Sequence, residues 1–102
     1  MNKWNIPNHL ETTIRSRDKE CVYCHTKFDK NSYKKRATWE HIDNNATNIS
    51  ERNIVLCCSS CNSSKGTKMF MNWLDSAYCK RLRITKESVS QIVKESIKNT
   101  NQ

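Results

Sequence analysis

The chain is poor in the residues that punctuate or extend a polypeptide, with one glycine and one proline among 102 residues. This scarcity excludes a collagen-like repeat, a flexible linker and a proline-rich segment. Hydrophobic residues are also few, at 35% of the chain. A small domain with so little apolar material usually needs a metal or covalent cross-link. We therefore expect one domain, residues 1–102, that depends on such a cross-link.

Long apolar runs are missing as well. No stretch approaches the length of a transmembrane helix, and the first seven residues lack the apolar core of a signal peptide. We therefore expect a cytoplasmic protein that is not bound to a membrane. In a reducing compartment the six cysteines indicate metal binding rather than disulfides.

Four of the cysteines form two pairs with the spacing of a zinc site. Cys21 and Cys24 make the first C-x2-C pair, and Cys58 and Cys61 make the second. Two intervening residues let one tight turn present both sulfurs, and four thiolates complete the tetrahedral shell of Zn²⁺. The spacing predicts a structural zinc site. We interpret His25 as an ordinary exposed histidine, because four cysteines already fill the shell.

The remaining elements are predicted from periodicity and capping signals. β-Branched and aromatic residues favour two strands on either side of a long polar loop, residues 43–52. Ser59 or Ser60 is expected to cap a short helix that Gly66 ends, and Thr85 to cap the last helix. Apolar residues of the helix over 68–81 are interpreted as core. The predicted elements are helix 7–17, strands 37–42 and 53–57, the short helix up to 66, and helices 68–81 and 85–98.

The formal net charge is +8, or roughly +6 once four thiolates hold Zn²⁺. A basic surface favours a polyanionic partner, and nucleic acid is the first choice. Basic residues cluster at 34–36, within a lysine-rich loop over residues 28–36, and at 80–83. On charge alone, a solvated basic surface is an equally good interpretation.

The centre of the chain thus reads strand, long loop, strand and helix inside a four-cysteine frame. This order resembles the HNH nucleases, whose active site is a ββα-metal fold. The matching residues are Glu40, His41, Asn53 and Asn62. Because Asn62 stands where a histidine is usual, the chain is an H-N-N variant, and its cysteine pairs match the zinc-bearing branch.

The resemblance covers about half the chain, residues 21–68, and leaves a helical extension at 69–98. It implies an α+β fold class: a small ββα-metal core, a structural four-cysteine zinc site and flanking α-helices. It also implies a metal-dependent DNA endonuclease that hydrolyses a phosphodiester to a 5′-phosphate and a 3′-hydroxyl.

Each motif residue has an expected role. His41, the only histidine in the strand–loop–strand–helix segment, is assigned as general base, since an unperturbed imidazole titrates near pH 6.5. By the resemblance, Glu40 and Asn62 hold the catalytic metal, and their oxygen donors favour Mg²⁺ or Mn²⁺. Asn53 is expected to bond the loop backbone and hold His41 in place. Since adjacent strand residues face opposite sides, the strand must end or bulge at Glu40 and His41.

Substrate contacts and rival functions stay open at this point. The phosphate contacts are assigned to Lys34, Lys35, Arg36, Lys65 and Lys68, with a solvated lysine as the alternative for Lys65. RNA is not excluded as a substrate. One active site cuts one strand, so a double-strand break requires a homodimer or two encounters. The rivals are a non-catalytic zinc module that binds nucleic acid and a subunit active only within a larger phage or restriction complex.

Overall fold

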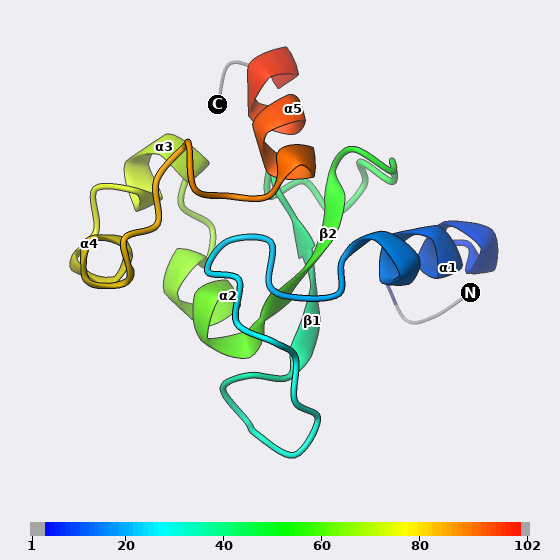
Figure 1. Cartoon of the computed structure of the whole chain (residues 1–102). Helices are drawn as coiled ribbons and strands as arrows, with labels where there is room; N and C mark the ends of the chain where they lie inside the picture. The colour runs from blue at the N-terminus through cyan, green and yellow to red at the C-terminus, as the bar shows by residue number, and fades with distance from the viewer. Residues whose placement is uncertain (1–3, 101–102) are drawn as a thin grey trace.

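The computed structural model describes residues 4–100, with side chains through Lys98, and shows a small α+β domain (Figure 1). A β-hairpin stands at its centre, with α1 on one side, α2 to α4 on the other and α5 at the top. The elements are α1 (Asn8–Arg17), β1 (Ala37–His41), β2 (Ile54–Cys58), α2 (Ser59–Lys65), α3 (Phe70–Trp73), α4 (Ala77–Leu82) and α5 (Gln91–Thr100). The predicted fold class is confirmed. Every helix between residues 4 and 100 is too short or too polar to span a membrane.

The two strands pair antiparallel, with Ala37 opposite Cys58 and His41 opposite Ile54. β2 is buried along its whole length, whereas β1 is largely half-buried. The polar loop between them is ordered by its own side chains. The Asn45 N–H donates to Asp43 Oδ1 at 2.8 Å, and the Thr47 N–H donates to Asn45 Oδ1 at 3.0 Å. Such Asx turns replace backbone pairing and give the loop a defined path.

The free edge of β2 is covered by the chain that leaves α1. The Leu56 N–H donates to Asp18 Oδ2 at 3.0 Å, and Arg17 Nη2 donates to the Ile54 carbonyl at 2.9 Å. Arg17 also pairs with Asp18 at 2.7 Å, and Asp18 is only 6% exposed. The unpaired edge of β2, which needs a donor and an acceptor, thus obtains the donor from Arg17 and the acceptor from Asp18.

Asp18→Ala should destabilise the protein, because it leaves the Leu56 N–H without its acceptor and the Arg17 guanidinium without its carboxylate partner. The expected loss is about 2–3 kcal/mol in the free energy of unfolding, measured by urea denaturation. Glu11→Ala is the matched control: it removes an exposed ion pair with Arg15 in α1 and should cost under about 0.5 kcal/mol. Equal losses in the two variants would show that the strand edge does not depend on Asp18.

The predicted helix over 68–81 is wrong as a single element. It divides into α3 and α4, because the Ser76 side chain accepts the Cys79 N–H at 3.2 Å and starts a new helix. Its core role is confirmed for Phe70 and Trp73, which are fully buried, with the Trp73 ring 5.0 Å from that of Tyr23.

The last helix also begins later than predicted. Thr85 does not cap it: the Ser88 N–H donates to Thr85 Oγ1 at 3.0 Å and the Thr85 N–H donates to Ser88 Oγ at 2.8 Å. This reciprocal pair closes a separate turn, and α5 starts at Gln91. The turn therefore uses the capping signal that was assigned to the helix.

Candidate functional site

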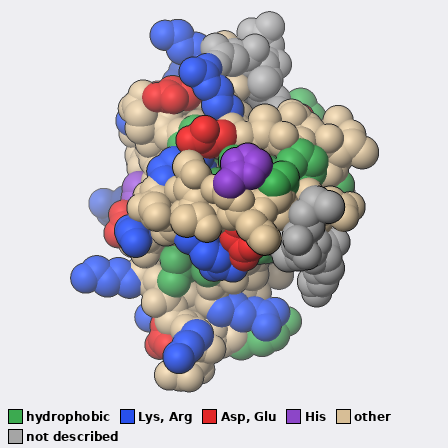
Figure 2. Space-filling model, turned by 90° about the vertical axis from the view of Figure 1, so that its right-hand side faces the viewer, with side chains coloured by type: hydrophobic (Ala, Val, Ile, Leu, Met, Phe, Trp, Pro, Cys, Tyr) green, Lys and Arg blue, Asp and Glu red, His purple; other side chains and the backbone are tan. Residues whose placement is uncertain are grey.

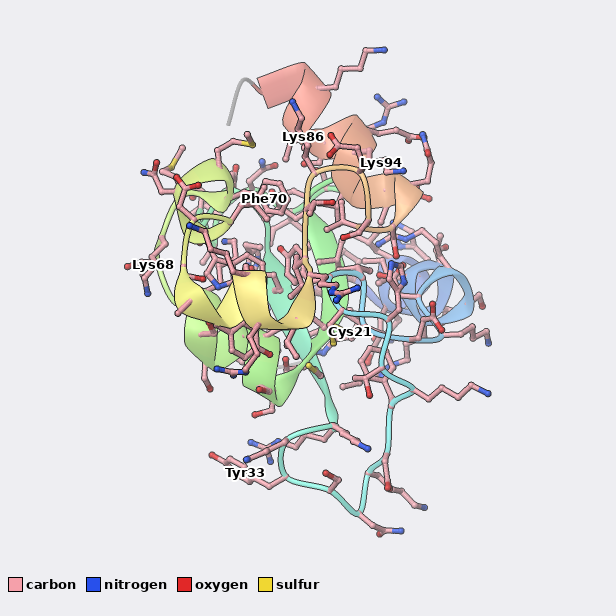
Figure 3. The ribbon with its side chains drawn as sticks, turned by 60° about the vertical axis from the view of Figure 1, so that its left-hand side comes forward. Cys21, Tyr33, Lys68, Phe70, Lys86 and Lys94 are labelled. Carbon is pink, nitrogen blue, oxygen red and sulfur yellow. The ribbon has the colours of Figure 1, made fainter. Side chains whose placement is uncertain are left out.

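The four paired cysteines converge as the spacing predicts. Their Sγ atoms all lie within 4.8 Å of one another, and Cys24 Sγ is 3.8 Å from Cys58 Sγ. Zn–S bonds of about 2.3 Å in a tetrahedron separate the sulfurs by about 3.8 Å. The cluster is therefore consistent with a structural Zn²⁺. Figure 3 labels Cys21, whose segment runs beside the hairpin.

The surrounding backbone favours thiolates. The Cys24 N–H donates to Cys21 Sγ at 3.5 Å, and the Cys61 N–H donates to Cys58 Sγ at 3.4 Å. Hydrogen bonds from Cys21 and the other thiols hold the pKa of Cys24 well below its usual range, whereas those from Cys21 and Cys24 raise the pKa of Cys58 and of Cys61. Tyr78 OH reaches across from α4 to donate to Cys61 Sγ at 3.2 Å. These contacts are the outer shell that orients metal-ligating side chains.

Cys58 has a second role, because its side chain caps α2 by accepting the Cys61 N–H. The expectation that Ser59 or Ser60 caps this helix is therefore wrong, whereas Gly66 ends the helix as predicted. The thiol at the β2–α2 junction thus joins the cysteine cluster to the start of the helix that carries Asn62.

Cys57, Cys79 and His25 lie outside the cluster. Cys57 and Cys79 are buried, and burial raises the pKa of both, so they are neutral thiols. His25 is exposed, as expected, and it contacts two other residues. Its ring lies 3.0 Å from Glu20 and contacts the backbone carbonyl of Ser88, which ties the first cysteine turn to the segment before α5.

The second site is a hollow of about 210 Å³ where β1, the loop and α2 meet. Glu40, His41 and Asn62 all line it. Glu40 turns into the domain and His41 is half-exposed at the last position of β1. Both residues hold paired positions in β1, Glu40 opposite Val55 and His41 opposite Ile54, and both line the hollow.

Glu40 is 6% exposed, and two donors contact its Oε2: Tyr23 OH at 3.1 Å and Lys65 Nζ at 3.1 Å. Burial raises the pKa of Glu40, and the nearby Lys65 ammonium opposes that shift. Lys65 is fully buried. Its assignment as a phosphate contact is therefore wrong, and so is the alternative of a solvated lysine.

His41 carries a nitrogen without a protein partner. Nε2 is buried and makes no hydrogen bond to any residue that the structure describes. Burial lowers the pKa of His41, against the opposing effect of the Asp43 carboxylate. The imidazole is therefore neutral at pH 7, which is the form that can accept a proton.

Asn62 is held by its amide nitrogen. Nδ2 donates to Thr38 Oγ1 at 2.9 Å and to the Trp39 carbonyl at 3.1 Å, so Oδ1 is turned away from the strand. Thr38 in turn donates to the Cys57 carbonyl at 2.8 Å. Sequence reasoning missed Thr38, because a β-branched residue in a strand predicts the strand and not its partner in α2.

Asn53 bonds the loop as expected. Oδ1 accepts the Asp43 N–H at 3.0 Å, and Nδ2 donates to the Asn48 carbonyl at 3.1 Å. It is buried one residue before β2 rather than at its start. Asn44 was missed as a site residue: at φ 63° its Nδ2 bonds the Thr67 and Lys68 carbonyls, both at 3.0 Å. The signal in the sequence is the residue type alone, since asparagine adopts a positive φ more readily than most residues.

A second hollow, of about 440 Å³, adjoins the first and shares Trp39 and Asn62 with it. It extends to Tyr33 and Arg36, whose guanidinium lies 4.6 Å from the Tyr33 ring centre. Tyr33 is 74% exposed and sits on the projecting loop (Figure 3). Among the assigned phosphate contacts, Lys34, Lys35, Arg36 and Lys68 are exposed.

Basic side chains are spread over the face shown in Figure 2, with acidic ones between them. The charge is therefore not gathered into one patch on that face. A comparison of the chain with protein-family models, curated proteins and solved structures gives no match. The resemblance to HNH nucleases thus rests on the motif residues and on the geometry of the two sites.

Proposed function

We propose that the protein is a metal-dependent DNA endonuclease of the HNH type, with a structural Zn²⁺ on its four clustered cysteines. The observation that carries the proposal is the convergence of Glu40, His41 and Asn62 on one hollow. A carboxylate, a neutral imidazole and an amide oxygen are the groups that hydrolysis of a phosphodiester requires. Their order in the sequence is that of the HNH motif.

His41 acts as the general base. Its Nε2 accepts a proton from the water that attacks phosphorus, since no described protein group occupies that nitrogen. Asn53 keeps the loop after β1 in place through its bonds to Asp43 and Asn48. The end of β1 that carries His41 is thereby held in place.

Glu40 and Asn62 would hold Mg²⁺ or Mn²⁺. The donor set fits, because the contacts of Asn62 Nδ2 leave Oδ1 for a cation and those to Glu40 Oε2 leave Oε1. Two protein oxygens suit Mg²⁺, which keeps several waters and binds substrate phosphates. When bound, the ion supplies positive charge that stabilises the phosphate and the leaving oxygen.

The adjoining hollow gives the DNA strand a path toward these residues. Arg36 lies on its wall, and Lys34 and Lys35 precede it on the same loop. Contacts of this kind release counterions, so binding should weaken by roughly 0.9 log units per contact for each tenfold rise in salt. A flat salt response would contradict binding through phosphates.

Supercoiled plasmid tests the function. The purified parent should nick it with Mg²⁺ or Mn²⁺, and His41→Ala should nick about 10²- to 10⁴-fold more slowly, because the general base is lost. His9→Ala, which removes an exposed histidine from α1, is the matched control and should keep full activity. Zinc content is measured in all three proteins, so that a misfolded variant is recognised.

Equal nicking by the parent and His41→Ala would contradict the assignment of the base. A folded parent that binds DNA but never cuts it would favour the non-catalytic zinc module. The ion pair of Glu40 with Lys65 is the observation that keeps this second function in view, since it already neutralises the proposed metal ligand. Cleavage only in the presence of partner proteins would indicate a subunit of a larger complex.

A further inference from the structure

The Lys65 ammonium is surrounded by oxygen atoms of Glu40, Ile42 and Asn44, a set called the oxygen cage below. Its Nζ is 3.1 Å from Glu40 Oε2, 3.2 Å from the Ile42 carbonyl and 2.8 Å from Asn44 Oδ1. The side chain has no exposed surface. Carboxylate, carbonyl and amide oxygens are the donors that a hard cation prefers. Here the cation in the cage is the protein's own ammonium group.

This ammonium balances the charge that a metal would use. Glu40 is the only acidic residue among the described residues that line the hollow, and Asn62 is neutral. Asp43, the next acidic side chain along the chain, accepts bonds from the Asn45 N–H and the Asn48 amide. A divalent cation in the hollow therefore meets one carboxylate with a positive charge already beside it.

We propose that Lys65 weakens the binding of the catalytic cation to the free protein, so that the cation binds together with DNA. This inference rests on the proposed nuclease function. The phosphate supplies the negative charge that Lys65 cancels on Glu40, and metal and DNA therefore raise each other's affinity by the same factor. Lys65 does not block the site, because it and Tyr23 both contact Oε2 and leave Oε1 for the ion.

The first test uses the parent protein loaded with zinc. Mn²⁺ binding is followed by electron paramagnetic resonance at pH 8, with and without a short duplex whose phosphorothioate linkages resist cleavage. The parent should bind Mn²⁺ at least tenfold more tightly with the duplex than without it. The Mn²⁺ that binds to the duplex itself is measured in a mixture of the duplex with the Asn62→Ala variant, and is subtracted. Equal affinity with and without the duplex would overturn the proposal.

The second test changes the charge in the cage. Lys65→Met should bind Mn²⁺ at least tenfold more tightly than the parent in the absence of DNA. Lys86→Met removes the same formal charge from an exposed side chain that lines neither hollow, and should bind as the parent does. Unchanged or weaker binding by a folded Lys65→Met would overturn the proposal.

Circular dichroism and zinc content establish whether Lys65→Met is folded, and if it is not, the titrations of the parent decide alone. The proposed role of Lys65 and the proposed nuclease function can fail separately. A parent that cuts DNA yet binds Mn²⁺ equally well without it refutes the role of Lys65 only. A parent that neither cuts DNA nor binds Mn²⁺ beside it refutes the nuclease as well.

Discussion

Removal of zinc should unfold the protein. The cysteine cluster joins the turn at Cys21 and Cys24 to the junction of β2 and α2. Cys21, Cys58 and Cys61 belong to the main hydrophobic cluster, and Cys24 packs against it. Structural Zn²⁺ binds with an apparent free energy of about 10–16 kcal/mol at pH 7, which matches or exceeds the 5–15 kcal/mol stability of typical domains. EDTA should therefore abolish the helical circular dichroism signal, and added Zn²⁺ should restore it.

Adjacent cysteines provide a control for this experiment. Cys58→Ser removes a zinc ligand and should yield an unfolded protein without bound zinc. Cys57→Ser changes the preceding residue of the same strand, which is buried but lies outside the cluster. It should keep one equivalent of zinc and lose only about 1–3 kcal/mol through burial of a hydroxyl. A zinc-free parent with an unchanged spectrum and a cooperative thermal transition would contradict the role of the metal.

The buried pair of Glu40 and Lys65 should dominate the effects of mutations within the hollow. Lys65→Met leaves a carboxylate that is 6% exposed without its cation, and Glu40→Gln leaves a fully buried ammonium without its anion. Loss of one partner of a buried pair costs about 3–5 kcal/mol. Urea denaturation should show a loss of this size in each single variant.

The double variant Glu40→Gln/Lys65→Met completes the cycle. It removes both charges, so its loss should be smaller than the sum of the two single losses by at least about 1 kcal/mol. Additive losses would show that the two groups do not stabilise each other. Glu11→Ala in α1 measures the loss of unfolding free energy when the removed acidic side chain is not buried.

Local signals account for the parts of the structure that could be predicted. Each C-x2-C turn, the two strands and the stop at Gly66 depend on residues a few positions apart. The break between α3 and α4 could not be predicted in this way, because the apolar period continues from Phe70 to Tyr78. Only the Ser76 cap interrupts it. Apolar spacing predicts a helix face but not whether one helix or two carry it.

The environment of Lys65 depends on distant residues. Its loop partners, Asn44 and the Ile42 carbonyl, lie 21 and 23 residues earlier in the chain. In sequence, a lysine one turn after Asn62 predicts an exposed cation, since lysine is rarely buried without a partner. The proposed metal ligands could be assigned from motif order, whereas the ammonium beside one of them could be seen only in the fold.

The cysteine cluster also sets an order of events during synthesis. Cys58 follows Cys24 by 34 residues, which takes about 2–7 s at about 5–20 residues per second. During this interval the nascent chain contains Cys21 and Cys24 but not yet Cys58 and Cys61. Asn62 is translated directly after Cys61, so the second cysteine pair and the proposed metal ligand of α2 join the nascent chain almost together. A ribosome that stalls before residue 58 therefore releases a fragment that lacks both the second cysteine pair and Asn62.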